Sequence, residues 1–292
     1  MKAAEWKDYT VIATGDGYKL EDWGGVKLLR PDPQVIWKSG TDMDKYPNLA
    51  AKYIRSDTGG GKWIIKGKMP ESWTVSYKDL KFKIKPMGFK HTGLFPEQAV
   101  NWDMMADLIK SAGREINVLN LFAYTGGATV ACSKAGAKVC HVDAAKAMVE
   151  RAGENVRLSK IEDGKVRYII DDCKKFVERE IRRGRRYDAV IMDPPSYGRG
   201  PNGEMWKIES ELFPLVKLCT EVLSDNPLFF LINSYTTGLQ PQVIKNILSI
   251  TLGNRLGGRV EAYEVGLKTL EKGIILPCGN SGIWINDIKD GQ

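Results

Sequence analysis

The sequence predicts an α/β fold, in which a largely parallel sheet has helices on both faces and a small β-rich domain precedes it. From residue 97 onward, stretches with helical spacing of apolar residues alternate with short apolar runs typical of buried strands. Repeated strand–helix units of this length form parallel sheets with covered faces. Seven strands are expected, at residues 116–122, 137–143, 165–170, 187–193, 228–233, 259–267 and 281–287.

Helical patterns precede and separate these strands. They are expected at residues 97–113, 126–136, 144–160, 173–183, 208–223 and 241–253. A cluster of four basic residues follows the third of the helices that come after a strand, at the amino ends of the strands: Arg182, Arg183, Arg185 and Arg186. Ligands of such sheets bind at the opposite, carboxyl ends. The cluster is therefore interpreted as a solvated loop, with a peripheral RNA contact as the alternative.

The first part of the chain has a different pattern. Short segments rich in aromatic and β-branched residues, such as TVIAT, GKWIIKG and FKIKP, are separated by Gly, Pro and Asp. Only residues 44–54 have spacing compatible with a helix. The sequence predicts a β-rich domain at residues 1–90 and the α/β domain at residues 91–292. Five tryptophans of the first domain are expected mainly to pack in its core, although aromatics on a β surface also stack on unpaired bases: Trp6, Trp23, Trp37, Trp63 and Trp73.

Composition bounds the class of protein. The 292 residues are 43% hydrophobic and 27% charged, as in ordinary globular proteins. No apolar run approaches the ~20 residues that cross a bilayer, and the first residues lack the apolar segment of a signal peptide. We therefore expect a cytoplasmic protein with no membrane partner, as a monomer or a homodimer.

Cysteine number and charge add two constraints. The five cysteines are odd in number and have no CxxC spacing, so neither a disulfide framework nor a metal site is expected. The formal charge of +7 is a modest excess that allows a polyanionic partner without requiring one.

The first motif, NLFAYTGG at residues 120–127, comes directly after a strand and opens a helix. Glycine lets the backbone approach a ligand closely, and a helix start presents unpaired N–H groups. The GxGxxG pattern that places a pyrophosphate on a helix N-terminus is absent, which disfavours a nicotinamide dehydrogenase.

Acidic residues end the next two strands. Asp143 ends the second strand, where a carboxylate can accept hydrogen bonds from both hydroxyls of a ribose. Asp171 and Asp172, followed by Cys173, end the third strand, where an Asp can accept from an adenine amino group. The alternative for each is a helix N-cap, since Asp is favoured there.

The sharpest motif is DPPSYG at residues 193–198, after the fourth strand. Two successive prolines fix φ and remove two N–H donors, so the Asp193 carboxylate and the Pro194 carbonyl are held rigidly. Acceptors held in this way suit the amino or imino edge of a flat base.

These motifs resemble those of class I S-adenosylmethionine-dependent methyltransferases. The segments NLFAYTGGATV, HVD, DDC and DPPSYG, with KHTGLFPEQ at residues 90–98, resemble bacterial large-subunit ribosomal RNA methyltransferases that modify cytosine C5 or guanine N7. The resemblance covers residues 88–285 and implies a Rossmann-like seven-stranded sheet, S-adenosylmethionine as cofactor and ribosomal RNA as partner. The first 85 residues do not resemble the RNA-binding module of many members.

The resemblance also implies roles for individual residues. The cofactor's methionine moiety is assigned to Phe122, Ala123, Tyr124, Thr125 and Gly126. Its ribose is assigned to Asp143 with Ala144, and its adenine to Asp172 with Asp171 and Cys173. Thr92 and Gln98 are expected to help close the cofactor pocket. Asp193, which also borders the cofactor, is expected to face the substrate with Pro194.

One position departs from the family pattern. Methylation of cytosine C5 requires a thiolate that first adds to the ring, and the members that do this carry a cysteine just after the fifth strand. Here that stretch is LINSYT, and Cys278 is the only substitute, more simply interpreted as a buried apolar residue. A nitrogen target needs no covalent adduct, and Asn233 with Asp193 is expected to orient it.

Two further classes stay open: a methyltransferase of a small molecule or protein, and a protein that binds the cofactor without catalysis. RNA affinity that falls steeply with added salt favours RNA methylation over the first of these classes, and a cofactor complex that transfers no methyl group to any acceptor favours the second. His91 is expected in an exposed turn or beside a ligand, and His141 is expected as a packed sheet residue rather than a base.

Overall fold

The computed structural model describes residues 1–56, 60–88, 90–199 and 205–287. The chain divides into two compact units, the first comprising Met1–Val100 with Gly266–Cys278 and the second comprising Asn101–Val265 with Gly279–Gln292. Within the described residues, every helix is too short or too polar to cross a bilayer.

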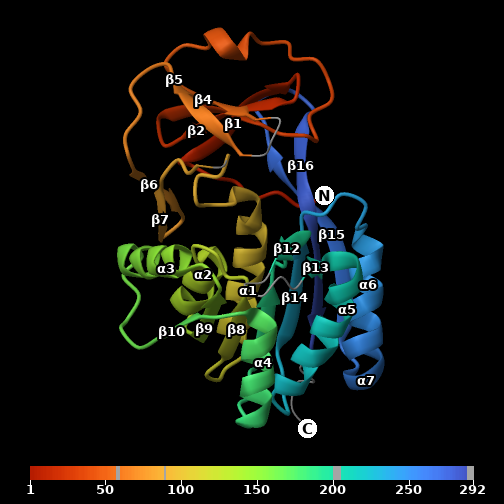
Figure 1. Ribbon diagram of the computed structural model, residues 1–292. Coiled ribbons are helices and arrows are strands. Elements are labelled where there is room, and N and C mark those ends of the chain that lie inside the picture. Colours follow the sequence, from red (N-terminus) through yellow and green to blue (C-terminus); the bar gives the residue numbers. More distant parts are fainter. Residues whose placement is uncertain (57–59, 89, 200–204, 288–292) are drawn as a thin grey trace. The chain divides into compact units, whose positions relative to one another are not determined.

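The first unit is built on a five-stranded sheet in the order β1-β2-β3-β4-β5 (Figure 1). Its strands are β1 (Tyr9–Gly15), β2 (Tyr18–Trp23), β3 (Val26–Pro31), β4 (Leu49–Arg55) and β5 (Gly61–Ile65). A separate antiparallel hairpin consists of β6 (Trp73–Tyr77) and β7 (Leu80–Ile84). The prediction of a β-rich region at the amino end is confirmed.

The expected helical spacing at residues 44–54 is wrong. Only a 3-10 turn, η1 (Met43–Lys45), precedes strand β4 there. The first three residues of β4, Leu49, Ala50 and Ala51, are all buried and show no alternation. A continuous apolar run cannot be told from a helix by periodicity alone.

A buried ion pair fixes β2 against β3 in this unit. Glu21 accepts hydrogen bonds from Nε and Nη2 of Arg30, at 2.6 and 2.7 Å, and from the Tyr9 hydroxyl at 2.8 Å. Burial alone raises the pKa of Glu21, but the charges of Arg30 and Lys19 outweigh it, so this pKa lies below its usual value. Arg30 also donates to the Lys90 carbonyl at 2.9 Å, which ties β3 to the segment after β7.

The tryptophans of the first unit mainly pack, as expected. Trp23 is fully buried. Half-buried Trp6, Trp63 and Trp73 each donate the indole N–H to a backbone carbonyl of the same unit, at 3.1, 2.8 and 2.7 Å.

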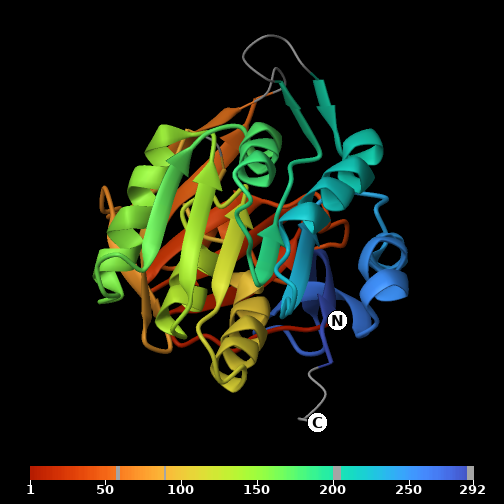
Figure 2. The same ribbon diagram turned by 90° about the horizontal axis from the view of Figure 1, so that it is seen from below.

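The second unit contains the predicted Rossmann-like sheet, with seven strands in the order β10-β9-β8-β11-β14-β16-β15. The strands are β8 (Asn117–Leu121), β9 (Lys138–Asp143), β10 (Val166–Ile170), β11 (Ala189–Met192), β14 (Phe229–Ser234), β15 (Arg259–Lys268) and β16 (Ile275–Ile285). The first five pair in parallel, whereas β16 runs antiparallel to β14. Figure 2 shows these strands side by side.

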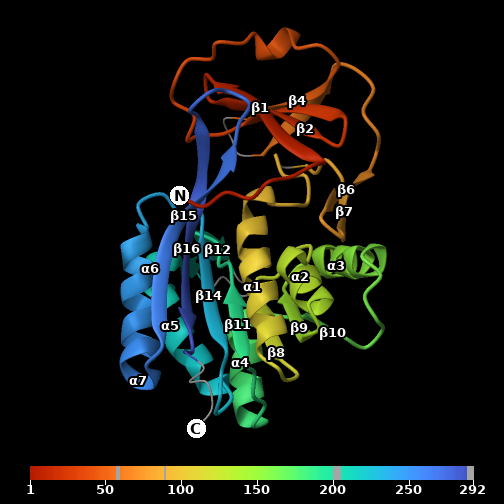
Figure 3. The ribbon, with the colours of Figure 1, turned by 180° about the vertical axis from the view of Figure 1, so that it is seen from behind.

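Helices cover both faces of this sheet. They are α1 (Ala99–Ser111), α2 (Gly127–Lys134), α3 (Lys146–Leu158), α4 (Cys173–Arg182), α5 (Ile208–Cys219), η3 (Thr220–Val222), α6 (Pro241–Leu248), the π-helix η4 (Ser249–Gly253) and α7 (Asn254–Leu256); the 3-10 turn η2 (Pro96–Gln98) belongs to the first unit. Helix α1 lies on one face, in front of the sheet in Figure 3, and α4 and α5 lie on the other.

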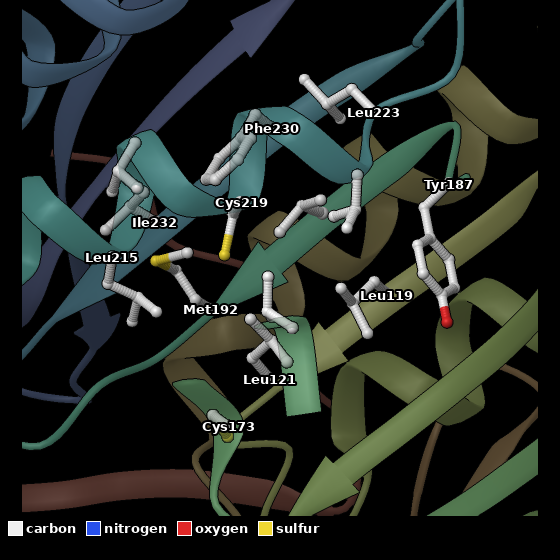
Figure 4. Close-up of a cluster of buried hydrophobic side chains, with 14 of the residues drawn as sticks. Leu119, Leu121, Cys173, Tyr187, Met192, Leu215, Cys219, Leu223, Phe230 and Ile232 are labelled. Atoms are coloured by element: carbon white, nitrogen blue, oxygen red, sulfur yellow. The ribbon is translucent and has the colours of Figure 1, made fainter. Parts of the chain in front are cut away.

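Alternate residues of each strand serve the two faces. Leu119 and Leu121 of β8 pack in a buried apolar cluster with Phe176 of α4 and Leu215 of α5 (Figure 4). On the opposite face, Asn120 donates to the Thr129 hydroxyl of α2 at 2.9 Å. Burial of one such leucine stabilises the fold by about 1.5–3 kcal/mol, so this double-sided packing holds the strands rigidly.

Candidate cofactor and methyl-transfer site

The order in which the chain adds strands reverses between β8 and β11. From β8 the chain adds β9 and β10 on one side, and it then adds β11 and β14 on the other. In open α/β sheets, ligands bind beyond the carboxyl ends of the strands at this switch point. The first and sharpest sequence motifs follow the two strands that border it.

Four adjacent strands end within two residues of one level. In the register, Leu121 is opposite Val142 and Met192, and Met192 is opposite Ile232. The next residues therefore lie in one row, in the spatial order Asp143, Phe122, Asp193 and Asn233. Phe122 and Asp193 lie just beyond their strands, whereas Asp143 and Asn233 are still paired in the sheet. With strands about 4.8 Å apart, this row extends over roughly 14 Å. We call it the strand-end row.

The loop after β8 is tightly bent. Phe122, Tyr124 and Gly126 all have left-handed φ values, of 54°, 50° and 83°. This conformation is costly for the two aromatic residues and persists only when neighbours fix it. Backbone N–H groups supply that support, since Phe122 donates to Cys173 Sγ at 3.3 Å and Tyr124 to the Asp143 carboxylate at 2.8 Å.

The two glycines of this loop are required by packing. A Cβ on Gly126 would lie 2.9 Å from the Cβ of Ala152 on α3. One on Gly127 would lie 2.7 Å from Cζ2 of Trp102 on α1. These glycines were expected to let a ligand approach the backbone. The space that a side chain would fill is instead occupied by residues of α3 and α1.

Asp143 orients the loop and remains partly exposed. Its Oδ2 accepts from Tyr124 N and its Oδ1 from Ala145 N, each at 2.8 Å. The N-cap residue of α3 is Ala145, which follows Ala144, and Asp143 accepts the hydrogen bond from the Ala145 N–H. Each carboxylate oxygen has a further lone pair, so Asp143 can accept hydroxyl donors while it holds the loop.

The two acidic residues that follow β10, Asp171 and Asp172, have partners within the protein. Asp172 caps α4 by accepting from Lys175 N at 2.9 Å, as its alternative interpretation predicted. Asp171 forms an ion pair with Arg179 and accepts from Asp172 N at 2.8 Å. Cys173 is buried, and burial raises the pKa of its thiol.

The segment after β11, which contains Pro194 and Pro195, contacts a short antiparallel strand pair that was not predicted from the sequence. Strands β12 (Tyr197–Arg199) and β13 (Met205–Lys207) pair in antiparallel fashion. Trp206 donates its indole N–H to the Pro195 carbonyl at 2.6 Å, and its ring lies 5.8 Å from that of Phe122. Trp206 therefore contacts the loops on both sides of the switch point. Pro194 is buried and Asp193 is partly exposed.

Asn233 belongs to a buried polar network. Its Oδ1 accepts from Asn101 at 3.1 Å and from the Ser281 hydroxyl at 2.8 Å. Tyr263 in turn donates to Asn101 Oδ1 at 2.7 Å. The network fixes the orientation of the Asn233 amide and occupies its carbonyl oxygen.

The two histidines have different settings. His141 is fully buried, contacts the Thr129 hydroxyl through Nδ1 at 2.9 Å, and has a pKa lowered to about 4 by burial. It is neutral at physiological pH and packs in the sheet, as predicted. In the first unit, His91 is half-buried, and this burial lowers its pKa to about 4.

Three other residues singled out in the sequence lie in the first unit. Thr92 and Gln98 are both buried there, and their roles toward the cofactor stay predictions. Cys278 hydrogen-bonds the Leu276 carbonyl at 3.6 Å. Burial, with Glu97 and other carboxylates nearby, raises the pKa of this thiol well above its usual value. This shift opposes the thiolate that nucleophilic attack needs.

The arrangement defines a class of protein. A family model described as S-adenosylmethionine-dependent methyltransferase matches residues 30–213, more than half of the chain. The chain belongs to this family of S-adenosylmethionine-dependent methyltransferases.

Individual proteins extend the comparison. The crystal structure of a SAM-dependent methyltransferase from Agrobacterium tumefaciens is 32% identical, with a TM-score of 0.91, covering 97% of this chain and 92% of that one. The structure of SMU.776 with SAH shares the fold, with a TM-score of 0.74 and 17% identity over 97% of this chain and 76% of that one.

A curated relative is the ribosomal RNA large subunit methyltransferase K/L of Pseudoalteromonas translucida, 27% identical over 179 residues. The match covers 61% of this chain and 24% of the relative. This chain thus spans about a quarter of that relative's length.

The packing of Gly127 against Trp102 predicts that a side chain at this position destabilises the protein. Gly127→Ala places a methyl group against the Trp102 ring, so we expect the free energy of unfolding to fall by about 1–3 kcal/mol. Gly40→Ala meets open space and has an ordinary φ, so it serves as the control. Urea unfolding measures both, and equal stabilities of the two variants would contradict the packing role.

The contacts of Trp206 predict that its replacement slows methyl transfer and leaves cofactor affinity unchanged. Trp206→Phe keeps a ring beside Phe122 but removes the hydrogen bond to Pro195, which contributes about 1 kcal/mol. We expect methyl transfer to slow about fivefold while calorimetric S-adenosylmethionine affinity is unchanged. Trp63→Phe removes an equivalent indole–carbonyl bond from the first unit. If both variants slow transfer equally, Trp206 has no positioning role.

Proposed function

We propose that this methyltransferase acts on a base of ribosomal RNA, with a nitrogen atom as the target. The observation that carries the proposal is the strand-end row, in which Asp193 lies beside Phe122 of the cofactor loop and Asn233 follows on the next strand. A curated relative named as a ribosomal RNA methyltransferase supports the choice of RNA. That substrate implies a cytoplasmic protein.

The cofactor is assigned to the Asp143 and Phe122 end of the row. The partly exposed Asp143 carboxylate, already oriented by two backbone N–H groups, suits a ribose diol. Asp172, with one oxygen engaged as a cap, retains acceptor capacity for an adenine amino group. The bend from Phe122 through Ala123, Tyr124 and Thr125 to Gly126 is assigned to the methionine moiety.

A nitrogen target is favoured over cytosine C5 by the state of the cysteines. Burial raises the pKa of every thiol in the chain, to about 12 for Cys132 and about 11 for Cys140, and likewise for Cys173, Cys219 and Cys278. Addition to C5 requires a thiolate. A nitrogen lone pair attacks a methyl group directly, and S-adenosylmethionine supplies that group on an electrophilic sulfonium.

In this proposal, Asp193 and Pro194 hold the base. Proline rigidity keeps the Asp193 carboxylate at the row, where it accepts an N–H of the target and takes up the proton released on transfer. The Asn233 amide is preoriented by Asn101 and Ser281, so it donates to the base at little entropic cost. A small-molecule or protein acceptor is the alternative.

Cofactor placement is tested with Asp143→Ala. Loss of the charged acceptor removes about 1.5–3 kcal/mol, so we expect the dissociation constant for S-adenosylmethionine to rise at least tenfold. Asp163→Ala, a removal of an exposed aspartate from the loop before β10, is the control. Unchanged affinity in Asp143→Ala, measured by calorimetry, would sink the ribose assignment.

The reaction is tested with radiolabelled cofactor and unmodified ribosomal RNA, followed by mass spectrometry of the nucleosides. We expect label in an N-methylated nucleoside, with Asp193→Ala reducing transfer about 100-fold or more at unchanged cofactor affinity. The exposed Asp225→Ala is the control. Labelled 5-methylcytidine would refute the nitrogen target, and label only in small molecules or protein would favour the alternative.

A further inference from the structure

Positive charge is concentrated in one short part of the first unit. Residues 62–90 contain eight lysines and no arginine against two acidic residues, an excess of six, whereas the whole chain has an excess of seven. The hairpin β6–β7 lies at the centre of this stretch. Whether these lysines lie together on one exposed face depends on how the two strands of the hairpin pair and pack.

One face of the hairpin is buried and anchored. Val75, Tyr77, Phe82 and Ile84 are each at most 3% exposed. Trp73 donates its indole N–H to the Trp23 carbonyl at 2.7 Å, which joins the hairpin to the end of β2. A free two-stranded hairpin is marginally stable in water, but this one is held by its apolar face.

The opposite face carries lysines. In the register, Ser76 is opposite Lys81 and Thr74 is opposite Lys83. Lys85 follows on the same side, and exposed Lys78 occupies the turn with a φ of 53°. Alternate residues of a strand lie about 6.6 Å apart, so Lys81, Lys83 and Lys85 form a regular row of charge. We call Lys78, Lys81, Lys83 and Lys85 the lysine face.

An acidic residue, Glu71, lies beside this face. Glu71 pairs with Lys85 at 2.9 Å, and both side chains are well exposed, at 87% and 47%. Exposed pairs of this kind contribute ~0–1 kcal/mol, so a polyanion can displace them.

We infer that the lysine face binds the phosphate backbone of the RNA that carries the target base, an inference that rests on the proposed function. An ammonium group is a point charge that binds phosphate without reading base edges, so the face adds affinity and orientation rather than sequence choice. The buried opposite face preorganises it. The lysine face is thus a second RNA contact, distinct in sequence from the strand-end row.

The test compares two triple variants of the full-length protein. Lys81→Gln/Lys83→Gln/Lys85→Gln removes charge from the face without altering its buried side. Lys38→Gln/Lys45→Gln/Lys110→Gln removes the same charge from exposed positions elsewhere. RNA binding is measured from 50 to 300 mM salt, and KM and kcat are measured with the labelled cofactor.

For the face variant, we expect KM for RNA to rise about tenfold or more with kcat and cofactor affinity unchanged. The slope of log affinity against log salt should fall by about 2 to 3, because each lost phosphate contact removes ~0.7–0.9. A variant with arginine at all three positions should retain both values.

The outcomes separate the two proposals. If the wild type methylates RNA and the face variant behaves like the control variant, the lysine face has no role and the proposed function stands. If the wild type neither binds nor methylates RNA, the proposed function fails and the inference fails with it. Wild-type binding to anionic vesicles or acidic proteins in preference to RNA would likewise overturn the inference.

Discussion

The register that aligns Leu121 with Val142 and Met192, and Met192 with Ile232, is the constraint on which the site depends. A slip of one residue would turn every side chain of a strand to the other face, and the leucines and Phe230 of the buried cluster resist it. Hydrophobic packing therefore sets the level at which Asp143 and Asp193 lie along their strands. The chemistry is positioned by residues that take no part in it.

Much of this fold could be predicted from the sequence. Helix–strand alternation gave all seven strands and the parallel sheet, because each element buries a face with its own period. The segment at Leu49–Arg55 could not be assigned, since its first three residues are all buried and show no alternation. Chain order also does not reveal that β16 lies between β14 and β15, since that placement depends on long-range packing.

The site was predicted only in part. The motif residues could be found because glycines in turns, acidic residues at strand ends and paired prolines each indicate a particular local backbone structure. What those residues contact could not be found. Gly127 faces Trp102, 25 positions earlier in the chain, and Asn233 is held by Asn101 and Ser281. Trp206 lies in a hairpin whose three-residue strands are too short to show periodicity. Such contacts exist only after the fold forms.

The first unit is assembled from two segments that are far apart in the sequence, residues 1–100 and 266–278. Thr14 donates to Glu271 through its backbone N–H and its hydroxyl, at 2.8 and 2.6 Å, and Leu270 donates to Val11 at 3.0 Å. During synthesis on the ribosome, the amino-terminal strands emerge long before residue 270. Strand β1 therefore lacks these hydrogen bonds until residues 270 and 271 have emerged, and the unit can close only after the strands from β8 to β14 have been synthesised.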